Sequence, residues 1–356
     1  MTTSKLSDTP TILDVARHAG VSVGTVSHVL NDRANVSDGR RNRVLGAIAD
    51  LGYVPNGLAQ GLRRRESRVV GLCAPVASSA YFAALLEAFE DLAAREGYVL
   101  MQVLSRGEPP LELRRVQALL ARKVDGMLLI PSVDPRDALE AIVASDVPVI
   151  VVDRASNDRR FDYVTIDDRA AMRDATRHLV SLGHRRLLYL VRDPRLVTTR
   201  RRIQGFREAA ARANTPVGTE VCQRAPDERA FARQVEVALS ARHAPTAIIA
   251  SNSDITLSLL RSLKQLAVRC PDDVSVLAFD EPVWADVLTP TLACVRHPTA
   301  LIASRAWQLL LQRMRGERGA PQRVALAAEL VPGESIAPPG ARIERARRIA
   351  PDVRRR

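Results

Sequence analysis

Hydrophobic positions in the first part of the chain recur at the three- and four-residue spacing of amphipathic helices. The spacing predicts helices over residues 12–19, 23–31 and 38–51, each following a Thr or Ser that can cap its first turn. Gly20 is expected to end the first helix. The predicted core is Ile12, Val15, Ala16, Val26, Val29, Leu30, Val44, Leu45 and Ile48. Residues 1–55 are therefore expected to form a small all-α domain.

From Val69 onward, short apolar runs alternate with amphipathic segments, a pattern typical of parallel sheets flanked by helices. The predicted strands are residues 69–73, 99–104, 126–130, 147–152, 187–191, 247–250, 274–278 and 292–296. Because this region is long for one doubly wound sheet, we expect an α/β domain over residues 67–336 with two lobes. Residues 67–166 and 297–325 would form the first lobe, and residues 167–296 the second.

The chain has 356 residues, of which 46% are hydrophobic, and a formal net charge of +12. A basic balance favours polyanionic partners, although it is a weak indication by itself. Much of the excess lies in residues 342–356, which contain seven arginines against Glu344 and Asp352. Two interpretations of this basic tail (residues 337–356) remain: a disordered, solvated end, which we favour, and an arm that contacts DNA.

Several classes of protein lack support in the sequence. The first residues contain no apolar stretch like that of a secretion signal, and no run is long enough to cross a bilayer, so we expect a cytoplasmic protein. The cysteines are spaced singly and predict neither a disulfide framework nor a metal site. No nucleophile elbow, phosphate loop or dinucleotide fingerprint occurs, so we expect neither an enzyme nor a cofactor.

The segment from Thr11 to Asn31 predicts two short helices that meet at Gly20, where a tight turn needs a residue tolerant of positive φ. The second helix has a small, polar outer face that can enter the major groove of DNA. An ordinary helical hairpin is the alternative on this pattern alone.

The same segment, with the sequence TILDVARHAGVSVGTVSHVLN, closely resembles the headpiece of the lactose-repressor (LacI/GalR) family. The resemblance continues through Leu51-Gly-Tyr-Val-Pro-Asn56. It implies a helix-turn-helix headpiece in which Val23, Gly24 and His28 contact bases. It also implies that Ser22, Thr25, Ser27 and Asn31 contact phosphates or cap helices. Gly24 is smaller than the usual family residue, so the base contacts of relatives do not transfer directly.

Residues 56–66 are too short for a stable isolated helix, and Gly57 and Gly61 each cost about 1 kcal/mol relative to alanine. The resemblance nevertheless implies a hinge helix here, ordered only on DNA. Leu62 would then wedge into the minor groove and Arg63 would follow as a minor-groove cation. A flexible linker is the alternative.

The large region resembles the family's effector domain, which has the type I fold of periplasmic sugar-binding proteins. In such folds ligands bind between the lobes at the carboxyl ends of strands. Asp153, Asn252 and Asp280 follow predicted strands, and Arg202 lies on the helix after another. Taken singly, each of these residues is better explained as a helix cap or a surface charge than as a ligand contact. Together they match the family's positions for gripping hydroxyl groups, which suits a sugar or polyol.

Four further residues are candidates for the same site. Tyr81, Phe82 and Trp284 are aromatic residues suited to stacking on a ligand. His297 stands where the family often has Gln, and it would either contact the ligand or pack at the hinge between the lobes.

These features predict a homodimeric transcriptional regulator, a repressor, whose affinity for double-stranded operator DNA is set by a carbohydrate effector between the lobes. No leucine heptads follow residue 340, so no tetramer is expected. A nucleobase or nucleoside co-repressor is the alternative effector, and a sugar-binding transport component is the alternative class. No metal is expected.

Leu62→Ala tests the proposed wedge. We expect the substitution to weaken binding to an operator selected from random DNA by roughly tenfold and to reduce the bend of that DNA. Electrophoretic shifts on circularly permuted fragments measure both quantities. Unchanged affinity together with an unchanged bend would contradict the assignment.

Overall fold

The computed structural model describes residues 10–30, 36–53, 66–77, 79–156 and 158–340. The chain divides into two compact units, Met1–Ser67 and Arg68–Arg356. No helix within these ranges is both long and apolar enough to cross a membrane.

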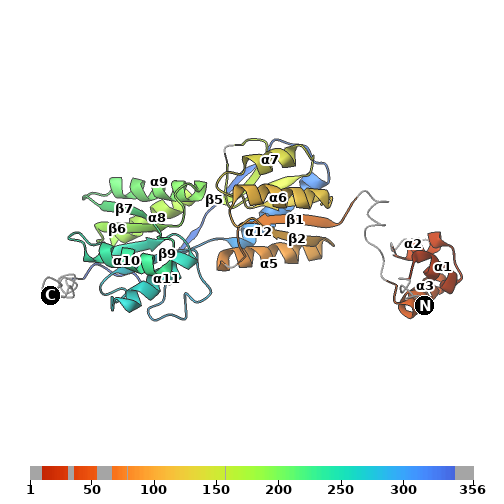
Figure 1. Ribbon diagram of the computed structural model, residues 1–356, viewed down its shortest axis with the longest axis horizontal. Helices are drawn as coiled ribbons and strands as arrows, with labels where there is room; N and C mark the ends of the chain where they lie inside the picture. The colour runs from red at the N-terminus through yellow and green to blue at the C-terminus, as the bar shows by residue number, and fades with distance from the viewer. Residues whose placement is uncertain (1–9, 31–35, 54–65, 78, 157, 341–356) are drawn as a thin grey trace, which may run out of the picture. The chain divides into compact units, whose positions relative to one another are not determined.

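The described residues of the first unit form three helices: α1 (Ile12–Ala19), α2 (Val23–Leu30) and α3 (Asp38–Leu51) (Figure 1). Thr11 begins α1 with a capping box, and Gly20 ends it at a φ of 62°. The side chain of Ser37 does not cap α3. Instead, the carbonyl oxygen of Ser37 accepts hydrogen bonds from the backbone nitrogens of Arg40 and Arg41 in the first turn. The buried core is Val15, Ala16, Ala19, Val26, Val29, Val44 and Ala47.

Leu45 is an exception to the predicted core. Its side chain is 50% exposed, because it lies one residue, or about 100° of helical rotation, beyond the buried Val44.

The first lobe of the second unit is a six-stranded sheet in which every pairing is parallel, in the order β11-β5-β4-β3-β1-β2. Its strands are β1 (Val69–Ala74), β2 (Val99–Leu104), β3 (Gly126–Leu129), β4 (Val149–Val152), β5 (Asp162–Ile166) and β11 (Arg323–Leu326). Helices α6 (Pro109–Ala121) and α7 (Arg136–Val143) cover one face, and α5 (Ala80–Arg95) and α12 (Thr299–Met314) cover the other (Figure 1).

The second lobe is another six-stranded sheet, in the order β12-β10-β9-β8-β6-β7, with only β12 antiparallel to its neighbour. Its strands are β6 (Arg186–Val191), β7 (Gly218–Gln223), β8 (Ala247–Ala250), β9 (Ser275–Phe279), β10 (Ala293–Arg296) and β12 (Glu329–Val331). Helices α8 (Asp168–Ser181) and α9 (Val197–Ala211) lie on one face, and α10 (Glu228–Ser240) and α11 (Ser253–Gln265) on the other.

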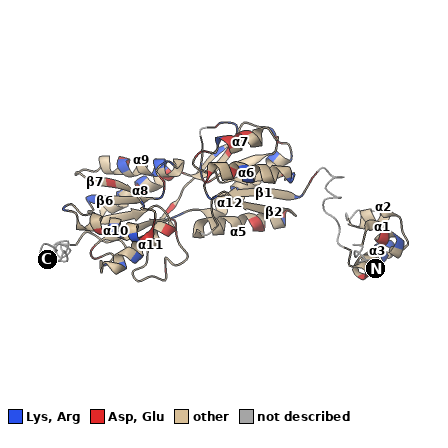
Figure 2. Ribbon diagram, in the orientation of Figure 1, with Lys and Arg blue, Asp and Glu red and all other residues tan. Residues whose placement is uncertain are grey.

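Strands β1, β3, β4, β8 and β9 are almost entirely buried and carry no charged residue, which Figure 2 shows for β1. This is the composition that a doubly covered parallel sheet requires. The hydrophobic pattern therefore located these strands. It did not predict β5, β7, β11 or β12, whose sequences mix polar and apolar residues.

The chain passes between the lobes three times: between β5 and α8, between β10 and α12, and between β11 and β12. Helix α12 and strand β11 complete the first lobe, and the chain then returns to the second lobe as β12. The expected all-α headpiece and two-lobed α/β architecture is confirmed.

Helices α8 and α9 approach each other closely at Gly205. A Cβ placed there would lie 2.1 Å from the backbone oxygen of Arg169 and 2.9 Å from the backbone nitrogen of Arg173. Because neither backbone atom can move without displacing α8, the contact requires glycine.

Gly205→Ala is expected to lower the free energy of unfolding of the second unit by about 3 kcal/mol, measured by urea denaturation. Gly46→Ala is the matched control, since Gly46 also lies within a helix but has nothing within 4 Å of its added Cβ. That control should stabilise the first unit by about 1 kcal/mol. Equal effects of the two substitutions would contradict the close approach.

Candidate functional site

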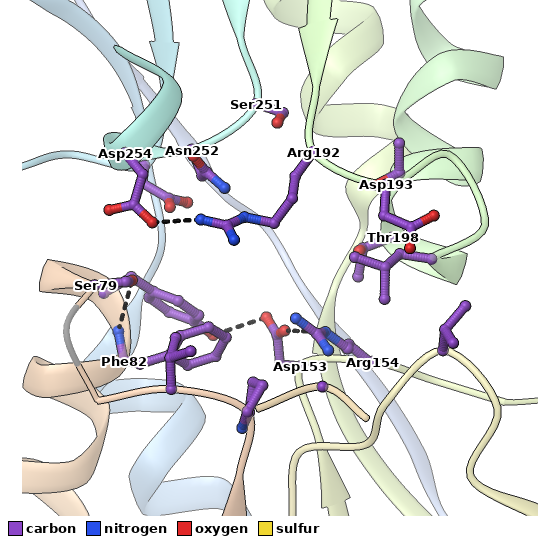
Figure 3. Close-up of a pocket in the computed structure, with 18 of the residues that line it drawn as sticks. Ser79, Phe82, Asp153, Arg154, Arg192, Asp193, Thr198, Ser251, Asn252 and Asp254 are labelled. Atoms are coloured by element: carbon purple, nitrogen blue, oxygen red, sulfur yellow. Dashed lines mark hydrogen bonds and ion pairs between the residues drawn. The ribbon is translucent and has the colours of Figure 1, made fainter. Parts of the chain in front are cut away.

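A cavity with a volume of about 280 Å³ opens between the two lobes of the second unit. Its walls meet at the carboxyl ends of β4, β6, β8 and β9, the edge at which parallel sheets bind ligands. Figure 3 shows Asp153 and Arg154 on the wall from the first lobe, facing Asn252 and Arg192 on the wall from the second. We refer to this cavity as the interlobe cleft.

Seven of the eight predicted ligand residues line the interlobe cleft: Tyr81, Phe82, Asp153, Arg202, Asn252, Asp280 and His297. Trp284 is not among the residues that line this cavity. Its indole ring packs against the hydrophobic cluster between α10, α11 and the second sheet. The loop after Asp280 is held by backbone hydrogen bonds in which the Ala285 nitrogen donates to Pro282 and the Leu292 nitrogen donates to Ala285.

Arg202 is the most firmly held group in the cleft. Its Nε donates to Oδ1 of Asp168 at 2.6 Å, and one terminal nitrogen donates to the carbonyl oxygen of Ser251 at 3.2 Å. Its guanidinium lies 3.7 Å from the ring centroid of Phe279, a cation–π contact. Burial raises the pKa of Asp168 to about 6, although the charge of Arg202 opposes this shift.

Asp153 connects three groups on the wall of the first lobe. Its Oδ1 accepts from the hydroxyl of Tyr81 at 3.1 Å, and its Oδ2 lies 3.6 Å from Nε of Arg154. Asp153 has a φ of 66°, a left-handed conformation that is strained for a residue with a side chain. This backbone turn directs the carboxylate into the cleft directly after β4.

Asp280 and His297 lie together where the chain passes between the lobes. Asp280 also has a positive φ, of 87°, and burial raises the pKa of its carboxyl to about 8. His297 stacks on Tyr81 with ring centroids 4.4 Å apart and meets Phe279 edge-on. Burial lowers the pKa of His297 well below its ordinary range.

The imidazole of His297 is buried without satisfying its polar atoms. Its Nδ1 lies 3.3 Å from Oδ1 of Asp280, but the arrangement does not meet hydrogen-bond geometry. Both ring nitrogens therefore lack a hydrogen-bond partner among the described residues. A buried polar group of this kind is unfavourable until something bonds to it.

Asn252 is both a helix cap and a residue of the cleft wall. Its Oδ1 accepts from the backbone nitrogen of Ile255 and caps α11, while the residue also lines the cleft. Because the oxygen is used by the cap, the amide nitrogen is the group that it can offer to a ligand.

Sequence reasoning missed several charged residues at this site, among them Arg154, Arg192 and Asp168. Arg154 and Arg192 line the cleft, and Arg192 forms an ion pair with Asp254 at 2.5 Å. Asp168 does not line the cleft but accepts a hydrogen bond from Nε of Arg202 and so fixes the position of that side chain. Arg154 directly follows Asp153, and this adjacency at a strand end was a usable signal. Asp168 gave none, because its partner lies 34 positions away.

In the first unit, α2 turns Val26 and Val29 inward. Ser22, Gly24 and His28 are exposed, and Val23, Thr25 and Ser27 are half-buried. The backbone nitrogen of Thr25 donates to Oγ of Ser22 at 3.2 Å, so Ser22 caps the helix. Asn31, Leu62 and Arg63, together with most of the expected hinge and the tail from residue 341, lie outside the described residues.

Comparison with known families accounts for both units. Residues 11–56 match the family described as bacterial regulatory proteins, lacI family, and residues 176–336 match the periplasmic binding protein-like domain. The chain belongs to the LacI family of transcriptional regulators. The expected family is thereby confirmed.

Relatives span nearly the whole regulator. DegA of Bacillus subtilis, an HTH-type transcriptional regulator, is 29% identical over 92% of this chain and 98% of its own length. The repressor PurR of Vibrio parahaemolyticus is 28% identical over 90% of this chain and 97% of its own. These relatives are transcriptional regulators rather than enzymes.

Solved structures agree in fold over the same extent. The lac repressor dimer bound to operator and the anti-inducer ONPF has a TM-score of 0.83 and 25% identity, over 92% of this chain and 99% of that one. A complex of the regulator CelR with cellobiose has a TM-score of 0.68 and 27% identity, over 92% and 100%.

The raised pKa of Asp280 predicts how stability depends on pH. The folded protein keeps this proton up to about pH 8, whereas an ordinary carboxyl, with a pKa of 3.8, has lost it. Between those values unfolding releases a proton, so the free energy of unfolding falls as pH rises and levels off above about 8. Asp168 acts in the same direction over a narrower window.

Asp280→Asn should therefore flatten the decline in melting temperature between pH 5 and pH 8, measured by thermal unfolding at constant ionic strength without added sugar. Asp286→Asn, on the exposed loop that follows, is the control and should retain the wild-type slope. A wild-type slope in Asp280→Asn would mean that Asp280 is not the titrating group.

Proposed function

We propose that this regulator is a homodimeric repressor that binds a near-palindromic operator and releases or engages it when a sugar or sugar derivative occupies the interlobe cleft. The observation that carries the proposal is the convergence of Asp153, Arg202, Asn252, Asp280 and His297 on one cavity between two lobes. The comparison with regulators and with a cellobiose complex supports it.

The cleft offers the mixture of groups that a polyhydroxylated molecule needs. Arg202 and the amide nitrogen of Asn252 donate, the oxygens of Asp153 accept, and the carboxyl of Asp280, which keeps its proton up to about pH 8, can donate as well as accept. A sugar hydroxyl can donate and accept at once, so it can serve both kinds of group. Tyr81 and Phe82, with ring centroids 5.1 Å apart, supply an apolar surface for the carbon face of a sugar ring.

A nucleobase or nucleoside is the second candidate effector. The same two aromatic rings provide a surface on which a flat base can stack. The two effectors differ in what they ask of Asp153 and Asp280, since a base has fewer hydroxyl donors than a sugar. A binding panel that contains both classes separates the candidates.

In the proposed complex with DNA, α2 lies in the major groove, where Val23, Gly24 and His28 meet base edges. Ser22, Thr25 and Ser27 position the helix on phosphates, and Asn31 is proposed to act with them. The absent side chain at Gly24 leaves His28 as the principal hydrogen-bonding group of this surface. Leu62 and Arg63 are proposed to enter the minor groove at the operator centre.

Control of DNA binding follows from a ligand that contacts both lobes. Contacts to Tyr81 and Asp153 in the first lobe and to Arg202 and Asn252 in the second favour one angle between the lobes. The first lobe begins at Arg68, immediately after the unit that carries the helix-turn-helix. A change in lobe angle is thereby proposed to alter how the two headpieces of a dimer are presented to DNA.

Thermal-shift measurements against monosaccharides, disaccharides, polyols, nucleobases and nucleosides test this function. A ligand at 100 times its dissociation constant should stabilise the folded protein by about 2.7 kcal/mol. Arg202→Lys should weaken that ligand by about tenfold or more, because lysine lacks the planar fork that holds Arg202 between Asp168, Ser251 and the cleft. Arg207→Lys, an exposed position on the same helix, should leave binding unchanged.

The hit from this panel is then titrated with and without operator. If the cleft controls DNA binding, operator changes the ligand affinity by the same factor as ligand changes the operator affinity. No stabilisation by any compound in the panel, or binding that operator does not affect, would contradict the proposed control.

A further inference from the structure

A buried carboxylate lies behind the wall of the interlobe cleft in the first lobe. Glu112 of α6 has no exposed surface, and its two oxygens accept from one residue of the loop after β3. Oε2 accepts from the backbone nitrogen of Ser132 at 2.5 Å, and Oε1 accepts from the Ser132 hydroxyl at 2.9 Å. Ser132 is buried as well, so these two hydrogen bonds hold the loop after β3 against α6.

The other side of the same loop is held by Arg154. A terminal nitrogen of Arg154 donates to the carbonyl oxygen of Pro131 at 2.8 Å. The rest of its guanidinium lies beside Asp153 and 5.9 Å from the ring centroid of Phe82, both of which line the cleft. The loop is therefore fixed between a buried anion and a guanidinium that is itself part of the cleft wall.

We propose that Glu112 is a positioning residue for effector binding, whose ionised carboxylate holds the loop of residues 131–133 and, through it, Arg154 in the wall of the interlobe cleft. The proposal rests on the proposed function, because it concerns the affinity of that same cleft. Glu112 does not line the cleft, so its influence is exerted through Ser132, Pro131 and Arg154.

The chemistry of the contact requires the ionised form. An ionised carboxylate only accepts, and both of its oxygens are used by the donors of Ser132. A protonated carboxyl turns one oxygen into a donor, which then faces a donor of Ser132. The opposite charge of Arg154 also stabilises the ionised form, and that attraction disappears when Glu112 gains a proton.

Groups from the neighbouring elements set where this change occurs. Burial raises the pKa of Glu112 to about 7, the hydrogen bonds from Ser132 and the charge of Arg154 lower it, and Asp134 raises it. The thiol of Cys73 on β1 is also close to it; burial and Glu112 raise the pKa of that thiol to about 12, and the charge of Arg115 on α6 opposes the shift. Cys73 is therefore neutral throughout the range in which Glu112 titrates.

Glu112→Gln removes the charge and places an amide donor against Ser132, with little change in volume. We expect it to weaken the hit from the sugar and nucleoside panel by roughly tenfold at pH 8, measured by calorimetry. Its affinity should also lose the part of the pH dependence that wild type shows between pH 6 and pH 8. Glu108→Gln, an exposed position at the start of the same helix, is the matched control.

A cycle of Glu112→Gln, Arg154→Gln and the double variant provides a readout that needs no ligand. If Glu112 holds Arg154, the two losses in melting temperature at pH 8 are not additive. The pH dependence of unfolding should also differ between wild type and Glu112→Gln between about pH 5 and pH 7, but not for Glu108→Gln.

The outcomes separate this inference from the proposed function. Additive losses with an unchanged pH profile of unfolding would overturn the positioning role whether or not a ligand is found. Equal ligand affinity and equal pH profiles in wild type and Glu112→Gln would overturn it as well. Failure of every compound to bind wild type would count against the proposed function, while a non-additive cycle would still support the link between Glu112 and Arg154.

Discussion

The buried ion pair between Arg202 and Asp168 is the interaction on which the interlobe cleft depends. Burying two charges is costly unless each is paired and hydrogen-bonded. Here Nε of Arg202 reaches Asp168 at 2.6 Å, and the guanidinium also contacts Ser251 and the ring of Phe279. Asp168 is the first residue of α8, where the chain enters the second lobe. The pair therefore links the start of α8, next to the connection between the lobes, to Arg202, a hydrogen-bond donor that lines the cleft. The close approach of α8 and α9 at Gly205 allows the short distance between Arg202 and Asp168.

Several residues of the cleft are held in conformations or environments that are locally unfavourable. Asp153 and Asp280 adopt positive φ angles, His297 is buried with two unbonded nitrogens, and the pKa of Asp280 is raised to about 8 by burial. Each feature is unfavourable by itself, because a left-handed backbone is strained for a residue with a side chain and a buried polar atom without a hydrogen-bond partner costs free energy. Strained backbone and unsatisfied polar groups of this kind cluster at functional sites, where the surrounding structure holds them in place.

The helix-turn-helix and the central strands could be predicted because their signals are local. Gly20 ends a helix, and residues such as 126–129 are apolar throughout because both faces of the sheet are covered. The placement of Asp153 and Asp280 followed from the rule that strand ends face the ligand. The same rule does not reach Trp284, because the course of its loop depends on backbone hydrogen bonds between Ala285 and both Pro282 and Leu292. Glu112 and Asp168 were missed for the same reason: their partners, Ser132 and Arg202, are distant in sequence.

The order in which the lobes are completed has a consequence for synthesis. The first sheet is complete only when β11 has joined its edge. The face opposite α6 and α7 is covered in part by α12, whose Ile302, Trp307 and Leu310 are buried against it. Both elements follow almost the entire second lobe along the chain, and β12 of the second sheet comes later still. On the ribosome, therefore, the first lobe is incomplete until translation has passed residue 326 and the second until it has passed residue 331, and an apolar sheet face stays uncovered for that interval. A nascent chain of this regulator is thus exposed to misfolding for longer than one whose lobes are contiguous.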